Sequence, residues 1–430
     1  SYNTAVGHNA GLSVSTGIRN VIIGGLAGDA MNTGHSSVAI GYEALGSATI
    51  ANHNVAIGID AMNVNVAADR NVAIGSEALK NMTAASTADH YNVAVGYNAG
   101  KAVTSGANNV LIGGLAGDAL NTGSHNIAIG REALSTETAH GYNIAIGGYA
   151  LQDQVAGADA FNIAIGYQAG TQINTGIVNT IVGGLAADAL TTGSENVALG
   201  YKALSTATST SNNIAIGSGA LENLNYDGAS NNTAVGHNSG NDITTGVQNT
   251  FLGSLAGDAL TTGVDNVALG YAALTSAMAG NRSVAIGSSA LQGQNHGVSA
   301  GQSFNNVAIG YNAGGAVSTG LQNVIIGANA GDALSSASFN VAVGYQALSQ
   351  EDANGRNVAI GYNSLATQNA GTDAYSVAVG FKASEASVTG LYNTAVGGEA
   401  LLTNIDGDNN TAMGYTALKT FEADTDGHGN

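Results

Sequence analysis

Small and β-branched apolar residues alternate in a five-residue phrase that recurs along the whole chain, as in Asn54-Val55-Ala56-Ile57-Gly58. The phrase closes on a glycine in 24 copies, usually spaced by about 17 residues. The residue before each glycine is aliphatic, and the residue three before it is Val, Ile or Thr. This period-2 pattern is typical of a β-strand. Because glycine returns every few residues, a helix is not expected.

A repeat this short leaves no room for a crossover helix, so each copy is expected to form one coil that pairs with the coils above and below it. The sequence therefore predicts an all-β fold, a single parallel β-solenoid (β-roll) of 24 coils, mostly with about 17 residues per coil. The pattern leaves no segment out. We expect one continuous solenoid over residues 1–430, with no separate domain or cap.

The fourth position after each repeat glycine alternates in pairs of coils. Gly11 and Gly28 occupy it in two coils, and Leu45 and Met62 occupy it in the next two. This alternation defines a superperiod of four coils, or about 70 residues. Extra residues enter mostly after the fourth coil of a group, which predicts a small loop at one edge.

The first position of the phrase is Asn in all copies except Ser37, Ser283 and Ser376. Asn tolerates left-handed backbone geometry, and identical Asn side chains stacked at one corner can hydrogen-bond along the axis. We expect a structural ladder rather than a binding row. Its first members are Asn3, Asn20, Asn54, Asn71, Asn92, Asn109, Asn126 and Asn143.

The centre of the phrase is Ala in all but five copies, each of them the second coil of a group. The exceptions are Ile22, Leu111, Ile181, Phe251 and Ile325. If this face of the strand is exposed, these residues form a periodic row suited to lateral contacts with a partner. If it faces inward, they only pack the core. The pattern leaves both interpretations open.

The second coils also carry a glycine-rich phrase, Gly24-Gly25-Leu26-Ala27-Gly28-Asp29. It resembles the calcium-binding nonapeptide of RTX β-rolls, in which adjacent turns share each ion. The corresponding aspartates are several coils apart, and Ala27 stands where that motif has Gly. We therefore expect no metal, with calcium kept as an alternative and a tight turn capped by Asp as the simpler interpretation. The residues concerned are Asp29, Asp118, Asp188, Asp258 and Asp332.

Charge and composition narrow the function classes. Only 9% of residues are charged and the formal net charge is -19, so a nucleic-acid partner is not expected. No apolar run is long enough to predict membrane insertion. The serines and carboxylates form no recognisable catalytic arrangement. We expect no enzyme activity, no catalytic residues and no cofactor.

The two ends of the chain match in phase. The sequence separation from Gly414 through Asn430 and on to Gly7 of a following copy equals the separation between Gly287 and Gly310 within the chain. Copies are therefore expected to stack end to end.

The phrase Asn54-Val55-Ala56-Ile57-Gly58 and its relatives resemble the β-roll head repeats of trimeric autotransporter adhesins, and similar repeats in tail fibres of environmental phages. The resemblance covers essentially the whole chain. It implies a parallel β-roll, often trimeric, that works in attachment.

We interpret the chain as a non-enzymatic structural fibre segment, located outside the cell, at the cell surface or on a virion. Its expected partner is itself, end to end and laterally, for example as a trimer. The alternative is a receptor-binding adhesin head or tail-fibre shaft that recognises surface glycans or proteins. An ice-binding solenoid is a third class, although Thr-Gly pairs such as Thr122-Gly123 form no continuous array.

Overall fold

The computed structural model describes residues 2–83, 88–295 and 303–421. These residues form strands and turns, and none of them is helical. The chain divides into two compact units, Ser1–Asn212 and Asn213–Asn430, which we call unit 1 and unit 2. Both are built from the same coil. The predicted continuity of the solenoid from one unit to the other stays a prediction.

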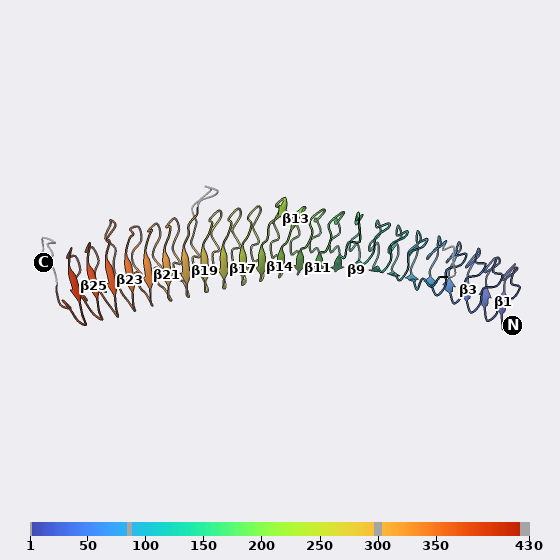
Figure 1. The fold of residues 1–430 in the computed structure, drawn as a ribbon, viewed down its shortest axis with the longest axis horizontal. Coiled ribbons are helices and arrows are strands. Elements are labelled where there is room, and N and C mark those ends of the chain that lie inside the picture. Colours follow the sequence, from blue (N-terminus) through green and yellow to red (C-terminus); the bar gives the residue numbers. More distant parts are fainter. Residues whose placement is uncertain (1, 84–87, 296–302, 422–430) are drawn as a thin grey trace. The chain divides into compact units, whose positions relative to one another are not determined.

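Each coil of unit 1 contributes one three-residue strand that ends just before a repeat glycine (Figure 1). These strands are β1 (Thr4–Val6), β2 (Val21–Ile23), β3 (Val38–Ile40), β4 (Val55–Ile57), β5 (Val72–Ile74), β6 (Val93–Val95), β7 (Val110–Ile112), β8 (Ile127–Ile129), β9 (Ile144–Ile146), β10 (Ile163–Ile165), β11 (Thr180–Val182) and β12 (Val197–Leu199). The short strand β13 (Thr210–Ser211) lies outside the repeat phrase.

Unit 2 repeats the arrangement, and the short strand β15 (Gly228–Ala229) is its exception. Its repeat strands are β14 (Ile214–Ile216), β16 (Thr233–Val235), β17 (Thr250–Leu252), β18 (Val267–Leu269), β19 (Val284–Ile286), β20 (Val307–Ile309), β21 (Val324–Ile326), β22 (Val341–Val343), β23 (Val358–Ile360), β24 (Val377–Val379), β25 (Thr394–Val396) and β26 (Thr411–Met413). The predicted all-β parallel solenoid of 24 coils is confirmed.

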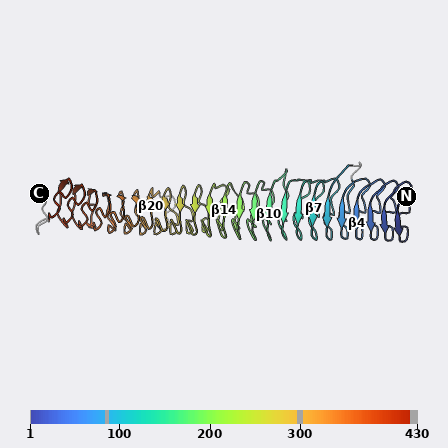
Figure 2. The same cartoon turned by 90° about the horizontal axis from the view of Figure 1, so that it is seen from below.

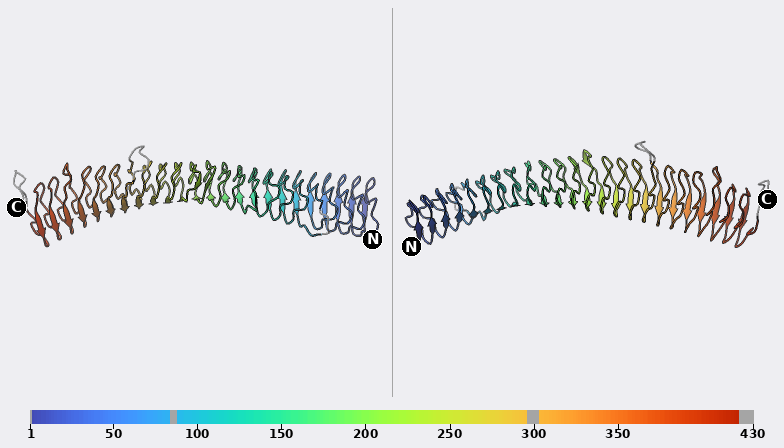
Figure 3. Two further views of the ribbon diagram at one scale, coloured as in Figure 1. Left: turned by 45° about the horizontal axis from the view of Figure 1, so that its top comes forward. Right: turned by 180° about the vertical axis from the view of Figure 1, so that it is seen from behind.

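Successive strands pair in parallel with the repeat phrases in register. Val38 pairs with Val55, and Ile40 with Ile57. The register holds where the spacing lengthens, since Val72 pairs with Val93 across one of the longer repeats. Extra residues therefore leave the coil as a loop and do not shift the sheet. In both units the strands lie side by side along one side of the stack, as Figure 2 and Figure 3 show from other directions.

From β2 onward, the central residue of each repeat strand is buried inside the coil, and its two neighbours face outward. Ala56 is fully buried, whereas Val55 and Ile57 are partly exposed. Alternation of this kind follows from the pleat of the strand. The space inside the coil is narrow, which explains the preference for alanine at the centre.

The repeat glycine is required by backbone geometry and by close packing of the coils. Gly58 has a φ of 140°, a region that L-residues rarely adopt. A Cβ atom there would lie 2.4 Å from the carbonyl oxygen of Gly75 in the next coil. Any side chain would therefore push neighbouring coils apart.

The four-coil superperiod has its cause inside the core. A Cβ atom on Gly100 or Gly117 would lie 2.5 or 2.8 Å from the side chain of Leu111, the bulky strand centre between them. The two glycines thus leave the space that Leu111 fills. In other coils the strand centre is alanine, and the fourth position carries a buried large residue such as Leu134. A large side chain thus enters the core from the strand centre in the coil of Leu111 and from the fourth position in the coil of Leu134.

Candidate functional site

The predicted asparagine ladder is present as a chain of buried hydrogen bonds. The Oδ1 atom of a ladder Asn accepts the backbone N–H of the residue at the same position in the next coil. Examples are Asn54, which accepts from Asn71 at 2.9 Å, and Asn92, which accepts from Asn109 at 3.0 Å. The Nδ2 atom of Asn109 donates to the carbonyl oxygen of Gly123 at 2.9 Å. Internal bonds occupy these side chains, so the ladder is a structural element.

The ladder tolerates the serine substitution that interrupts the phrase. The backbone N–H of Ser37 donates to Asn20 Oδ1 at 3.0 Å, and Ser37 Oγ accepts the N–H of Asn54 at 3.2 Å. Asn3 joins the ladder through the N–H of Asn20 at 2.9 Å. The remaining links run in the same way through Asn71, Asn92, Asn109, Asn126 and Asn143.

Of the two interpretations left open for the bulky strand centres, burial rules out lateral contacts and supports core packing. The exposed fraction is 1% for Ile22 and 0% for Leu111, Ile181, Phe251 and Ile325. As the middle residues of three-residue strands, they point into the coil and pack against its glycines. They are core residues and cannot reach a partner.

The apolar surface belongs instead to the residues on either side of the strand centre. We call the outer face the set of residues one and three positions before each repeat glycine. In every coil these positions carry Val, Ile, Leu, Met or Thr, and none carries a charge. Ile112 is 37% exposed, Ile165 36% and Leu252 45%. Sequence alternation indicated two faces, but it did not show which one the coil encloses.

The five aspartates of the second coils are separate from one another. No group of three or more His, Asp or Glu residues in the described ranges is arranged to hold a metal ion. Burial raises the pKa of Asp118, Asp258 and Asp332, and hydrogen bonds from nearby backbone N–H groups oppose this shift. These backbone contacts fit the capped turn, and the expectation of no metal at Asp29 and its equivalents stays a prediction.

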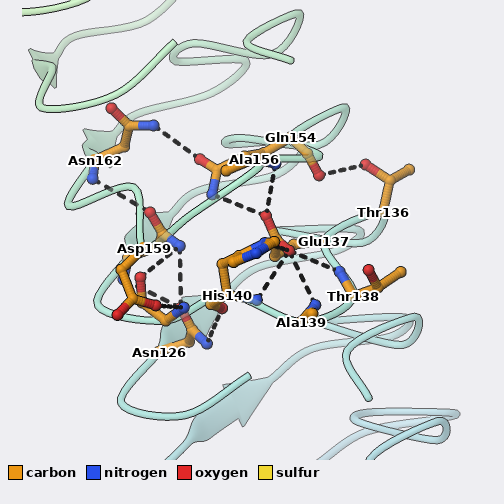
Figure 4. Close-up of polar contacts among 12 residues, drawn as sticks. Asn126, Thr136, Glu137, Thr138, Ala139, His140, Gln154, Ala156, Asp159 and Asn162 are labelled. Atoms are coloured by element: carbon orange, nitrogen blue, oxygen red, sulfur yellow. Dashed lines mark hydrogen bonds and ion pairs between the residues drawn. The ribbon is translucent and has the colours of Figure 1, made fainter. Parts of the chain in front are cut away.

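Unit 1 holds a fully buried carboxylate that sequence analysis did not identify. Oε1 of Glu137 accepts the backbone N–H groups of Thr138, Ala139 and His140 at 2.9 to 3.1 Å (Figure 4). Oε2 accepts Gln154 Nε2 at 3.3 Å and the N–H of Ala156 at 3.1 Å. These donors compensate for the burial of the charge.

The equivalent carboxylate of unit 2, Glu351, is also fully buried but has fewer donors. Oε1 accepts the N–H of Asn354 at 3.0 Å, and Oε2 has no partner among the described residues. Gln368, which matches Gln154, directs its Nε2 to the carbonyl oxygens of Val388 and Gly390 instead. Burial raises the pKa of Glu351. Both oxygens of the buried carboxylate thus accept hydrogen bonds in unit 1, whereas only one of them does so in unit 2.

Basic residues are few and mostly paired with carboxylates on neighbouring turns. The Nζ atom of Lys80 lies 2.9 Å from Asp60 Oδ2, and Arg70 pairs with Asp89. The other pairs are Lys101–Glu77, Arg131–Glu132, Arg282–Asp265, Arg356–Asp373, Lys382–Glu385 and Lys419–Glu399. Since these pairs lie at the surface and are partly exposed to solvent, each contributes little to stability.

No protein-family model matches this chain, and no curated protein is significantly similar to it. The resemblance to adhesin and tail-fibre repeats stays a prediction. In the described ranges, no helix has the length and apolar character needed to cross a membrane.

Proposed function

We propose that this chain is a non-enzymatic structural fibre segment whose copies associate laterally through the outer face. One observation carries the proposal: an uncharged, partly exposed row of aliphatic and threonine side chains continues through every repeat strand of each unit. Contiguous apolar patches of this kind are rare on monomeric proteins and usually mark an interface.

The period of the outer face favours a second copy of the chain as the partner. Side chains on neighbouring parallel strands repeat at about 4.8 Å. Only a partner with the same spacing can interdigitate with such a surface along its length, and another copy provides that spacing. The net charge of -19 adds repulsion between copies that meet through other faces. A lateral homo-oligomer such as a trimer satisfies both conditions.

The proposal includes end-to-end stacking and a location outside the cell, at the cell surface or on a virion. A chain without cysteine, with few charges and with an edge built of short polar turns suits a passive, exposed fibre. The alternative function is recognition of surface glycans or proteins. It draws support from a polar groove in unit 1 that contains Asp153 and Asn174.

Charge placed on the outer face tests the proposal. In sedimentation velocity at tens of micromolar, we expect wild-type protein to form a homo-oligomer and the variant Ile129→Lys/Ile146→Lys to sediment as a monomer. The control Ser105→Lys/Thr122→Lys places the same charge on exposed positions of neighbouring coils and should behave as wild type. Circular dichroism establishes that each variant is folded. A monomeric wild type, or equal effects of both variants, would contradict lateral association.

A further inference from the structure

A shallow groove of about 510 Å³ crosses the coils of β9, β10 and β11 in unit 1. It is lined mainly by Asp153, Gln172, Asn174, Thr175, Thr191 and Thr192. These residues follow the repeat glycine by six to nine positions, and in sequence they lie about half a coil from the outer face. Lateral association through the outer face would leave the groove open.

The groove contains polar groups that the fold does not use. Among the described residues, the side chains of Asp153, Gln172 and Asn174 make no hydrogen bond. Two threonine hydroxyls at the groove, those of Thr171 and Thr191, are occupied because they donate to backbone carbonyl oxygens of neighbouring coils. One carboxylate, two amides and further hydroxyls are therefore free to bind a ligand.

At the equivalent positions in unit 2, the side chains hydrogen-bond to each other. Asn223 and Asp242 occupy the same places in their coils as Asp153 and Gln172. There, Asn223 Nδ2 donates to Asp242 Oδ1 at 3.4 Å, so the amide and the carboxylate are directed at each other. The same polar edge is satisfied internally in unit 2 and left free in unit 1.

We infer that the groove of unit 1 binds a neutral oligosaccharide. Sugar hydroxyls donate and accept hydrogen bonds, and carboxylate, amide and hydroxyl side chains complement them. The Asp153 carboxylate and the net charge of -19 oppose anionic ligands. Asp153 is the only carboxylate among the lining residues, so a calcium ion would find a single charged ligand there.

The size of the groove and an exposed apolar residue near it fit the same ligand class. The volume is within the range of about 300–1,000 Å³ typical of ligand pockets. Val155, 46% exposed, donates its backbone N–H to the carbonyl oxygen of Asn174 at 2.9 Å. Its backbone is thus joined to a residue that lines the groove, and its exposed side chain is a nearby apolar group that could meet the C–H face of a sugar ring.

The test uses the full chain and a glycan array that carries neutral and anionic oligosaccharides of two to four sugars, followed by calorimetry with the best neutral hit. The variant Gln172→Ala/Asn174→Ala should weaken binding at least tenfold. The control Asp242→Ala/Thr244→Ala changes the same two coil positions in unit 2 and should bind as wild type. Circular dichroism and sedimentation of each variant report folding and association independently of sugar binding.

Every result of these measurements either supports or contradicts oligosaccharide binding at the groove. Binding of a neutral oligosaccharide that the unit 1 variant loses and the unit 2 variant keeps would support it. Absence of binding by folded wild-type protein, equal binding by both variants, or a preference for sialylated or sulfated sugars would overturn it. Lateral association is measured separately, so either idea can fail alone.

Discussion

The side-chain oxygen of Asn109 accepts a hydrogen bond from the backbone N–H of Asn126, one coil away, at 2.9 Å. Both residues are fully buried. The amide of Asn109 also donates to the carbonyl oxygen of Gly123 at 2.9 Å. One side chain thus satisfies two buried backbone groups of the neighbouring coil, and the same arrangement recurs along each unit.

Replacing Asn109 by alanine should destabilise the coils on both sides of it. The change leaves a buried N–H and a buried carbonyl without partners, at a cost of about 1–3 kcal/mol for each group. Hydrogen exchange should accelerate at the Asn126 N–H and its neighbours. Asn109→Ser is the matched control and should be milder, because Ser37 fills the same position and still accepts the N–H of Asn54. Equal effects of alanine and serine would argue against the ladder.

Two adjacent glycines should differ sharply in their tolerance of alanine. Gly113 has a φ of 134°, and a Cβ there would lie 2.5 Å from the carbonyl oxygen of Gly130. Gly114 has no atom within 4 Å of the same position. We expect Gly113→Ala to lower the free energy of unfolding by at least about 2 kcal/mol. Gly114→Ala should change it little. Denaturant titration of both variants measures the two free energies. Equal losses would mean that close packing between coils does not restrict these positions to glycine.

Substitutions at two neighbouring residues of β17 should affect different properties, stability for Phe251 and lateral association for Leu252. Phe251 is fully buried between Gly240 and Gly257, so Phe251→Ala should cost about 3–5 kcal/mol of stability. Leu252 is 45% exposed on the outer face, so Leu252→Ala should leave stability within about 0.5 kcal/mol and weaken association. Thermal unfolding and sedimentation of both variants check this division. The reverse assignment of effects would mean that the outer face is not the interface.

Glu351 should make unit 2 less stable as pH rises. Burial raises the pKa of its carboxyl in the folded state, so the folded chain holds the proton more tightly than the unfolded chain does. This contribution to stability is complete below about pH 4.3, the ordinary value for glutamate, and is lost as pH rises through the folded pKa. Glu351→Gln should therefore gain stability over wild type as pH increases, as unfolding measured from pH 4 to 8 would establish.

The equivalent change in unit 1 is the control. Glu137 accepts hydrogen bonds through both oxygens, and a glutamine would direct an NH₂ group at one of these sets of donors. Glu137→Gln should lower stability by about 1–3 kcal/mol at neutral pH. If the two glutamine variants behaved alike, the difference in hydrogen bonding between the two sites would not govern their stability.

Most of the fold could be predicted from local pattern. The alternation around Ala56, the recurrence of Gly58 and the corner Asn54 each report a constraint that acts within one coil or between neighbouring coils. Because the same constraints recur in 24 copies, a sequence pattern that would predict little in one copy predicts the fold clearly when it is repeated. The four-coil superperiod was visible for the same reason.

The functional surfaces depend on information that the pattern does not contain. Alternation gives two faces of a strand, and only the closure of the coil decides that Ile22 lies inside and Ile23 outside. The burial of Glu137 was equally hidden, because its donors come from turns in its own coil and the next. The groove arises where side chains of three coils meet, and it depends on which of them already have partners.

Thiol protection on the outer face tests the central claim most directly. The chain has no cysteine, so Ile129→Cys and Thr122→Cys each introduce a single reporter, one on the outer face and one in an exposed bend between β7 and β8. At assembling concentrations Ile129→Cys should react with a maleimide at least tenfold more slowly than in dilute solution, whereas Thr122→Cys should react at one rate throughout. A reaction rate for Ile129→Cys that does not change with protein concentration would contradict a fibre built through this face.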